Sequence, residues 1–293
     1  MLIVSRNSVD HLGECLRSIE RHRPPAELVD LRVRVFDNAS TDGSADLIEQ
    51  SFPDAELVRS ETNVGFARAN NVLAAASTAD YLLLLNPDTT LVSDVVTPLL
   101  EMLRTDARIA VVAPALEYPD GRRQYSSEQF PTLRFELANA LSGTKLWSAL
   151  RRPLRLDRVL AETRRTAVVD SAQTHDAQFV WATCWLVRRK DVRPEGLFDE
   201  RYFVYDEDLD YCRRIHESGR RIVWLGSARI AHHGGSSSST RAKERLAHAS
   251  RRLYYRRHRG VAAAAAYAAV VRAVEAAKAT TGFLRRRHRA DPS

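Results

Sequence analysis

Cysteine is scarce in this chain of 293 residues, which contains only Cys15, Cys184 and Cys212. An odd and scattered set of this kind provides neither a disulfide framework nor the paired spacing of a cysteine metal site. Few unpaired cysteines are typical of a reducing compartment. We therefore expect a cytoplasmic protein, which could work at the inner face of the cell membrane.

Long apolar runs are also missing. A membrane-spanning helix needs roughly 18–20 uninterrupted apolar residues, and the longest candidate, residues 261–271, is shorter and consists largely of alanine. Charged side chains occur as early as Arg6 and Asp10. We therefore expect neither a transmembrane helix nor a signal peptide.

Lysine is rare as well, because only four of the 44 basic residues are lysine. The net charge is +7, and residues 241–259 hold eight lysines and arginines against one acid. Such segments seek phosphate on nucleic acid or on membrane lipid, unless they form a solvated bundle. We favour a membrane surface and expect no nucleic-acid partner, because Leu246, Leu253 and Tyr254 supply an apolar face without a recognisable nucleic-acid motif.

The first half of the chain alternates short apolar runs with helical periodicity, which predicts an α/β fold with a mostly parallel sheet flanked by helices. Ligands of such sheets bind beyond the carboxyl ends of the strands, so polar residues at those ends are site candidates. The expected strands are 2–4, 33–36, 56–59, 81–85, 109–113, 179–187 and 222–225, and the expected helices are 11–21, 44–50, 64–76, 93–104 and 208–218.

The periodicity also suggests a domain organisation. Residues 1–240 are expected to form a catalytic domain with a nucleotide-binding half at about 1–115 and an acceptor half at about 116–240. The periodic signal weakens between about 120 and 176. Residues 241–293 are expected to form a basic extension of two helices, at about 241–257 and 261–284.

Two strands of the first half end in carboxylates. Asp37 follows the second strand, where it could accept hydrogen bonds from a nucleobase or ribose, although Ser40, Thr41 or Asp42 could simply cap the next helix. Asp88 follows the fourth strand in the sequence Asn-Pro-Asp, where a divalent cation could bridge it to a diphosphate. A turn in which Asp88 caps a helix is an equally good interpretation.

Two further loops carry candidate ligands. A glycine turn before a helix, with Gly65 in Asn-Val-Gly-Phe-Ala, could present backbone N–H groups to phosphate, although a single glycine favours an ordinary helix start. His232, in a His-His-Gly-Gly loop after a strand, could bind metal or phosphate or lie on the surface. Both alternatives stay open on the residues alone.

The most distinctive segment is residues 196–214, in which carboxylates alternate with phenylalanine and tyrosine. Aromatic packing lowers the local dielectric and raises a carboxyl pKa toward the range of a general base. A plain acidic helix N-terminus is the alternative. Glu207 and Asp208 lie at the centre of this segment.

Taken together, these motifs resemble glycosyltransferase family 2, the inverting, metal-dependent GT-A group, over roughly residues 1–240. The resemblance rests on their order and spacing, and the Asn-Pro-Asp and Asn-Val-Gly-Phe-Ala forms resemble its rhamnosyltransferase-like branch. The matching motifs are Asn7-Ser8, residues 37–44, residues 63–67, Asn86-Pro87-Asp88, Phe198-Asp199-Glu200, Glu207-Asp208 and His232.

The resemblance implies a GT-A fold and a role for each matching residue. Asp208 is the implied base, beside Glu207, and Asp88 with His232 is the implied site of Mg²⁺ or Mn²⁺. Asn86 replaces an acid of the family motif, so the metal rests on one carboxylate. The implied nucleotide-binding residues are Asn7, Asp37, Asp42, Gly65, Arg68, Asn70 and Asn86, and the acceptor is expected at Trp181, Thr183 and Asp206.

The resemblance also implies substrates. The expected donor is dTDP-L-rhamnose, with UDP-hexose or UDP-galactofuranose as alternatives, and the acceptor hydroxyl belongs to a glycan, a lipid-linked sugar or a natural product. A degenerate protein that binds a nucleotide sugar without transferring it is the alternative function. The oligomeric state is left open, with a homodimer as one option.

Overall fold

The computed structural model describes the chain except residues 143–146, 148–149, 166–172, 235–240 and 290–293. Its main sheet has the order β3-β2-β1-β4-β11-β6-β12-β5, with β7 paired to β6 and β9 paired to β12, while β8 and β10 form a separate pair. The strands are β1 (Leu2–Ser5), β2 (Arg34–Asn38), β3 (Glu56–Ser60), β4 (Tyr81–Leu85), β5 (Thr89–Leu91), β6 (Ile109–Glu117), β7 (Arg123–Gln124), β8 (Ser127–Glu128), β9 (Thr174–Asp176), β10 (Phe179–Val180), β11 (Cys184–Arg188) and β12 (Arg221–His232).

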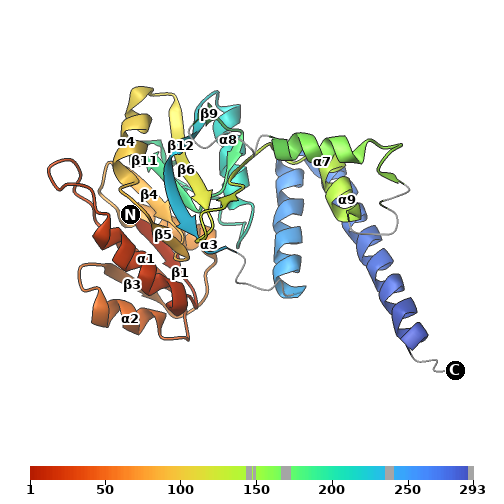
Figure 1. Cartoon of the computed structure of the whole chain (residues 1–293), viewed down its shortest axis with the longest axis horizontal. Helices are drawn as coiled ribbons and strands as arrows, with labels where there is room; N and C mark the ends of the chain where they lie inside the picture. Colours follow the sequence, from red (N-terminus) through yellow and green to blue (C-terminus); the bar gives the residue numbers. More distant parts are fainter. Residues whose placement is uncertain (143–146, 148–149, 166–172, 235–240, 290–293) are drawn as a thin grey trace.

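Helices cover both faces of this sheet, which confirms the predicted α/β architecture (Figure 1). The strands β1 to β4 run parallel, whereas β11 is antiparallel to its neighbours β4 and β6. The helices are α1 (Val9–Arg21), α2 (Ser44–Ser51), α3 (Phe66–Ala76), α4 (Val96–Thr105), α5 (Leu133–Leu141), α7 (Leu156–Arg165), α8 (Glu207–Glu217) and α9 (Arg241–Arg289), with a 3₁₀ turn at Arg189–Asp191.

The unbroken apolar run of β4 divides the interior into two cores. Leu82 and Leu84 point into the core beneath α3 and α8, and Leu83 and Leu85 point into the core beneath α1 and α4. All four leucines are buried. Since successive side chains of a strand face opposite sides, a strand covered on both faces must be apolar throughout, as the sequence indicates.

One predicted strand is interrupted. Residues 179–187 were expected to be continuous, but β10 ends at Val180 and β11 begins at Cys184. Between them, the N–H of Trp181 binds the Ser126 carbonyl and the N–H of Ala182 binds the Asp208 carboxylate. The prediction was wrong here because apolar character alone does not show where backbone groups leave a ladder.

The helix α3 begins two residues later than predicted because of Gly65. This glycine has φ +87° and ψ 166°, a combination that side chains with a Cβ rarely adopt. The N–H of Phe66 also binds the Phe203 carbonyl at 2.7 Å, which brings the two loops into contact. A Cβ added at Gly65 would lie 2.4 Å from the Phe203 oxygen.

A pair of glycine substitutions separates this close contact from backbone strain. Gly65→Ala is expected to lower the free energy of unfolding by about 3 kcal/mol, because strain and backbone overlap add. Gly43 also has a positive φ, of +89°, but its Cβ would meet no atom within 4 Å. Gly43→Ala should therefore cost only about 1 kcal/mol. Urea denaturation measures both, and equal costs would show that the contact with Phe203 does not matter.

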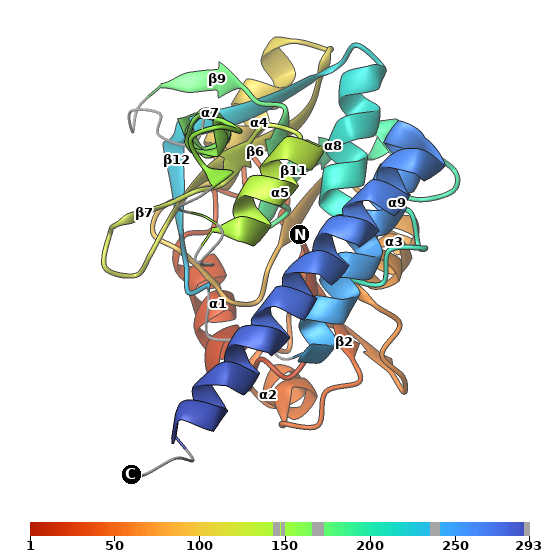
Figure 2. The same cartoon turned by 90° about the vertical axis from the view of Figure 1, so that its right-hand side faces the viewer.

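The C-terminal helices pack against the sheet domain rather than standing apart from it. The helix α9 breaks at Gly260, where φ is +86°, which confirms the two predicted helices. Tyr254, Tyr255 and Tyr267 from both parts belong to the same core as α3 and α8. In Figure 2, α9 runs diagonally past α5 and the lower end of α8. The domain boundary at 240 stays a prediction. No described helix combines the length and apolarity required to cross a bilayer.

Candidate active site

The acidic turn at the start of α8 places two carboxylates in different surroundings. Glu207 is buried, and its Oε2 has no hydrogen-bond partner within the described residues. Asp208 is partly exposed, and its oxygens accept the N–H of Ala182 at 3.2 Å and that of Leu209 at 2.8 Å. Asp208 can therefore reach a ligand from the loop side, whereas Glu207 is enclosed.

Burial sets the protonation behaviour of this pair. It raises the pKa of Asp208 to about 6, since the backbone N–H of Ala182 offsets only part of its effect and the charge of Asp206 adds to it. Burial also raises the pKa of Glu207 well above its ordinary value, and the neighbouring charge of Asp208 raises it further. Near neutral pH, Asp208 is thus an ionised carboxylate with an elevated pKa, as a general base requires.

A second group forms where β4 and β12 end. Asp88 Oδ2 lies 3.3 Å from His232 Nε2, and the N–H of His233 binds the Asp88 carbonyl. Burial alone would raise the pKa of Asp88, but the hydrogen bond and charge of His232 outweigh it and lower the pKa. Asp88 therefore stays a negatively charged carboxylate, which can bind a cation.

Gln124 orients His232 from the other side. Its Oε1 lies 2.7 Å from His232 Nδ1, and its Nε2 donates to the His232 carbonyl. A hydrogen bond from Nδ1–H to the amide oxygen fixes the ring and turns its Nε2 toward Asp88, which is how histidine ligands are commonly oriented. The sequence carried no signal for Gln124, because it lies in the segment of weak periodicity, 108 residues before His232.

The two groups are joined by one short segment. The N–H of Asn86 binds the Thr183 carbonyl at 2.9 Å, and the N–H of the preceding residue, Ala182, binds Asp208. Thr183 is itself buried, and Trp181 is partly exposed beside it. The structure therefore brings the turn with Asn86 and Asp88 and the turn with Asp208 to the same end of the sheet.

Two buried polar atoms also lie at this end of the sheet. Asp37 Oδ1 and Asn86 Oδ1 are buried and have no hydrogen-bond partner among the described residues. Asp37 uses its other oxygen to accept the N–H of Ser40. Buried acceptors without partners are costly, so both atoms are suited to accept hydrogen bonds from a ligand at this edge.

Two predicted nucleotide-binding residues have structural partners instead. Asp42 accepts the N–H groups of Val9 and Ser44 through its two oxygens, so it caps the starts of α1 and α2. Asn7 Oδ1 accepts the N–H of Thr41. The oxygens of both side chains thus join the first two strand-to-helix loops. Both residues are exposed, and their role in nucleotide binding stays a prediction.

The predicted nucleotide-binding residues at the start of α3 also have protein partners. Asn70 is buried and donates to the Phe66 carbonyl, so it faces the protein interior. A glycine is required at position 65 because a Cβ there would overlap the Phe203 carbonyl. The N–H groups of Gly65 and Phe66, which were expected to hold phosphate, bind the Asn63 side chain and the Phe203 carbonyl. Arg68 is exposed, 3.8 Å from Glu200.

Asp206 is a further predicted site residue whose side chain has a protein partner. It was expected to bind the acceptor, but both its oxygens accept hydrogen bonds from Arg251, at 2.7 and 3.0 Å, and it is buried. The sequence missed this contact because Arg251 lies in the basic segment, which resembles a solvent-facing surface.

The residues present fit a divalent cation only in part. The described part of the chain contains no group of three or more histidine, cysteine or acidic side chains that are placed to hold one metal ion. Asp88 and His232 offer one oxygen and one nitrogen, and a hard cation held by one or two protein ligands completes its shell with substrate phosphate and water. The donor set therefore fits a metal that binds together with a diphosphate.

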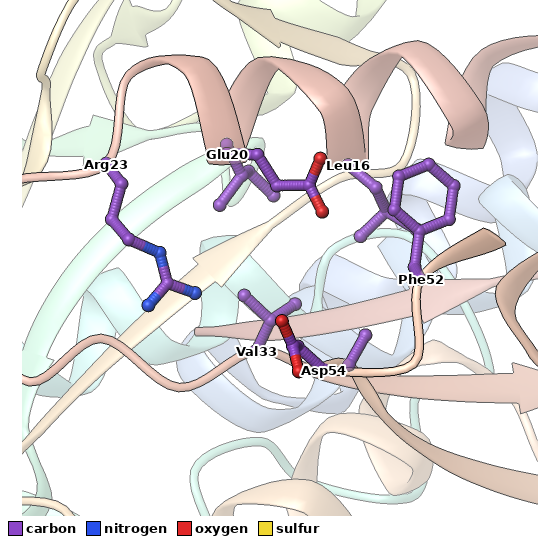
Figure 3. Close-up of a pocket in the computed structure, with 8 residues that line it drawn as sticks. Leu16, Glu20, Arg23, Val33, Phe52 and Asp54 are labelled. Atoms are coloured by element: carbon purple, nitrogen blue, oxygen red, sulfur yellow. The ribbon is translucent and has the colours of Figure 1, made fainter.

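A separate hollow lies at the opposite edge of the sheet (Figure 3). It is lined by Leu16 and Glu20 of α1, by Phe52 and Asp54, and by Val33, which directly precedes β2. The carboxyl end of β2, with Asp37, is at the other edge. We therefore do not place the reaction in this hollow.

The sequence matches a known family over more than half of the chain. The family model described as "Glycosyl transferase family 2" matches residues 1–194. The N-acetylglucosaminyl-diphospho-decaprenol L-rhamnosyltransferase of Mycobacterium tuberculosis is 28% identical over 216 residues. That match covers 69% of this chain and 66% of the relative, which is slightly less than two thirds of its length.

Solved structures share the fold at low sequence identity. GalNAc-T7 with UDP, GalNAc and Mn²⁺ gives a TM-score of 0.59 at 14% identity, over 87% of this chain and 47% of that one. The mannosyltransferase PcManGT from Pyrobaculum calidifontis, with GDP-Man and Mn²⁺, gives 0.54 at 16%, over 96% and 77%. TarS from S. aureus with UDP-GlcNAc gives 0.51 at 17%, over 86% and 64%. These likenesses concern the fold alone.

Proposed function

Because the chain belongs to glycosyl transferase family 2 and has the GT-A fold, we propose that it transfers a sugar from a nucleotide donor to an acceptor hydroxyl with inversion. The observation that carries this proposal is the segment 182–183. Its backbone binds Asp208 on one side and Asn86, two residues from Asp88, on the other. A single displacement needs the base and the leaving diphosphate to be held close together. Here two adjacent residues bind the turn of the base and the turn of the diphosphate site.

Asp208 performs the proton transfer in this proposal. The acceptor hydroxyl oxygen forms a bond to the anomeric carbon while the bond from that carbon to the diphosphate breaks. The hydroxyl proton passes to the partly exposed carboxylate of Asp208, and the electron pair of the broken bond stays with the diphosphate. Attack opposite to the leaving group, without a covalent intermediate, inverts the anomeric centre.

The other end of the site holds the leaving group. Asp88 and His232 would hold a divalent cation, which supplies charge stabilisation to the departing diphosphate when bound. Oδ1 of Asp37 and Oδ1 of Asn86, which are buried and have no partner among the described residues, are placed to accept hydrogen bonds from N–H or hydroxyl groups of the nucleotide. Gln124 fixes the ring of His232 throughout.

The proposed donor is dTDP-L-rhamnose, and the proposed acceptor is a lipid-linked sugar diphosphate. Support comes from the rhamnosyltransferase relative, whose name states a decaprenol-linked N-acetylglucosamine. UDP-hexose and UDP-galactofuranose remain the competing donors. The competing function, a nucleotide-sugar-binding protein without transfer, is disfavoured by the raised pKa of Asp208 in a partly exposed position.

A donor screen with matched nucleotides tests this function. We expect dTDP-L-rhamnose with Mn²⁺ to raise the Tm, and to be transferred to a GlcNAc-diphosphate lipid, more than UDP-glucose or UDP-galactofuranose does. The corresponding free nucleotides serve as controls for base recognition. Stabilisation by a donor without transfer or hydrolysis would support the binding protein, and no response to any nucleotide sugar would contradict the proposal.

A lipid-linked acceptor places the reaction at a membrane surface, and exposed arginines of α9 support such placement. Arg245, Arg252, Arg256 and Arg259 are exposed on α9. We propose that they contact anionic headgroups. Co-sedimentation with anionic vesicles should be lost when all four become glutamine, and unchanged sedimentation would contradict this contact. Removing the whole extension is a poor test, because it also removes the core residues Tyr254 and Tyr255.

A further inference from the structure

The turn that leads into the catalytic helix has an unfavourable backbone. Tyr205 and Asp206 have φ angles of +70° and +61°, and both lie in the left-handed region although neither is glycine. Such residues persist only where the surroundings hold them. Since α8 begins directly afterwards, with Glu207, this turn sets the direction in which Asp208 points.

Arg251 of α9 holds this turn. Its Nε and Nη2 donate to the two oxygens of Asp206 at 2.7 and 3.0 Å, a bidentate pair, and its Nη1 donates to Glu136 of α5. The neighbouring Ser250 donates its hydroxyl to the Val204 carbonyl at 2.8 Å. One turn of α9 thus binds both the backbone and the side chain of the strained segment.

Two more residues of α9 bind the same acidic region on either side. Arg257 pairs with Asp199 before the turn, and also lies 3.3 Å from Asp210 after it. His258 Nε2 lies 2.8 Å from the same Asp210 oxygen. The basic residues that pair with the carboxylates around Asp208 are therefore distinct from Arg245, Arg252, Arg256 and Arg259, which are proposed to contact headgroups.

We propose that Arg251 is a positioning residue for the reaction: by clasping Asp206 it fixes the left-handed turn and so directs the Asp208 carboxylate toward the acceptor. This proposal rests on the proposed function, because it takes Asp208 as the base. It assigns to the C-terminal extension a part in the active site that the sequence motifs of residues 1–240 do not contain.

The charges around Asp206 give this role a signature in the pH profile. Asp206 itself raises the pKa of Asp208, and the Arg251 guanidinium balances its charge. Removing Arg251 leaves that charge unbalanced, so the acid limb of the kcat/KM profile should move to higher pH. The titratable and charged groups that face Asp206 from the elements packed around it are Tyr202, Glu207, Asp208, Arg251, Tyr254 and Tyr267, with Glu136 beyond Arg251.

Three full-length variants test the proposal. Arg251→Ala is expected to lower kcat by about 10- to 100-fold, because a small misplacement of a reacting group has effects of this size, while the donor KM stays within about twofold. Arg251→Lys keeps the charge but not the bidentate geometry, so it should fall between Arg251→Ala and the wild type. Arg272→Ala, at an exposed position of the same helix outside the set proposed to contact headgroups, should behave as the wild type.

Hydrogen exchange supplies a readout that does not depend on turnover. The amides of residues 204–208 should exchange faster in Arg251→Ala than in Arg272→Ala. Unchanged kcat, acid limb and exchange would overturn the proposal, and so would a lower Tm with unchanged kcat and acid limb. If the wild type transfers no sugar, the proposed function fails, while the exchange of residues 204–208 still decides whether Arg251 holds the turn. If Arg251→Ala does not fold, Arg251→Lys carries the same comparison.

Discussion

Asp208→Asn is expected to lower kcat by about 10²- to 10⁴-fold, the usual contribution of a general base, while donor affinity stays close to that of the wild type. The amide cannot take up the acceptor proton, yet it has nearly the same volume, and its single oxygen can still accept one of the two N–H groups, of Ala182 or of Leu209, that the carboxylate binds. Steady-state transfer rates and donor binding by calorimetry measure the two effects separately.

The pH dependence of the wild type follows from the same carboxylate. Burial raises the pKa of Asp208 to about 6, and the base must be ionised to act. Transfer should therefore be independent of pH well above 6 and fall as the pH drops through about 6, with a slope approaching tenfold per unit. Asp208→Asn should lack this limb. A wild-type limb near pH 4 would contradict the raised pKa.

Glu207→Gln is the matched control for this prediction. Glu207 is enclosed beside Asp208, and its raised pKa keeps it largely protonated near neutral pH. A neutral glutamine of similar size should therefore keep transfer within about tenfold of the wild type. If Glu207→Gln lost more activity than Asp208→Asn, the proton transfer would belong to Glu207.

Stability should change in the opposite direction to activity. Because the folded pKa of Asp208 is raised, its contribution to stability is present at low pH and is lost as the pH rises through about 6. Asparagine does not ionise. The Tm difference between Asp208→Asn and the wild type should therefore become more positive from pH 5 to pH 8, which distinguishes the loss of a base from general damage to the fold.

The parts of the fold that were predictable follow from local patterns. The leucines of β4 show a strand covered on both faces, and Asp37, Asp88 and Asp208 follow or face strand ends where an open sheet binds ligands. Gly260 was not needed to predict two C-terminal helices, since the change from a basic to an alanine-rich segment already separates them.

The parts that were not predictable depend on contacts between distant residues. Asp206 and Asp208 have the same charge and lie two positions apart, yet one binds Arg251 and the other faces the loop of Ala182. No periodicity connects residue 206 with 251, or residue 124 with 232. The sequence also does not show which polar residue near a strand end is available to a ligand. Asp42 accepts the N–H groups at two helix starts, whereas Asp37 Oδ1 has no hydrogen-bond partner among the described residues.

Asp88→Ala is expected to remove the metal dependence of donor binding. With Asn86 in place of a second acid, Asp88 and His232 are the protein ligands available at the end of β4, so a cation held there depends on the donor diphosphate for most of its shell. We expect Mn²⁺ to strengthen donor binding to the wild type by about 100-fold, and to have little effect on the variant. Calorimetric titration of dTDP-L-rhamnose with Mn²⁺ or with EDTA measures this difference.

Asp80→Ala is the matched control, because Asp80 is an exposed acid at the opposite end of the same strand, directly before Tyr81. Its removal changes the net charge as Asp88→Ala does but leaves the diphosphate site intact, so Mn²⁺ should still strengthen donor binding. His232→Ala removes the nitrogen ligand and should lose part of the metal effect. Equal donor affinity for the wild type and Asp88→Ala, in both Mn²⁺ and EDTA, would place the diphosphate site elsewhere. If Asp88→Ala bound the donor more weakly than the wild type in EDTA as well as in Mn²⁺, Asp88 would contact the nucleotide directly.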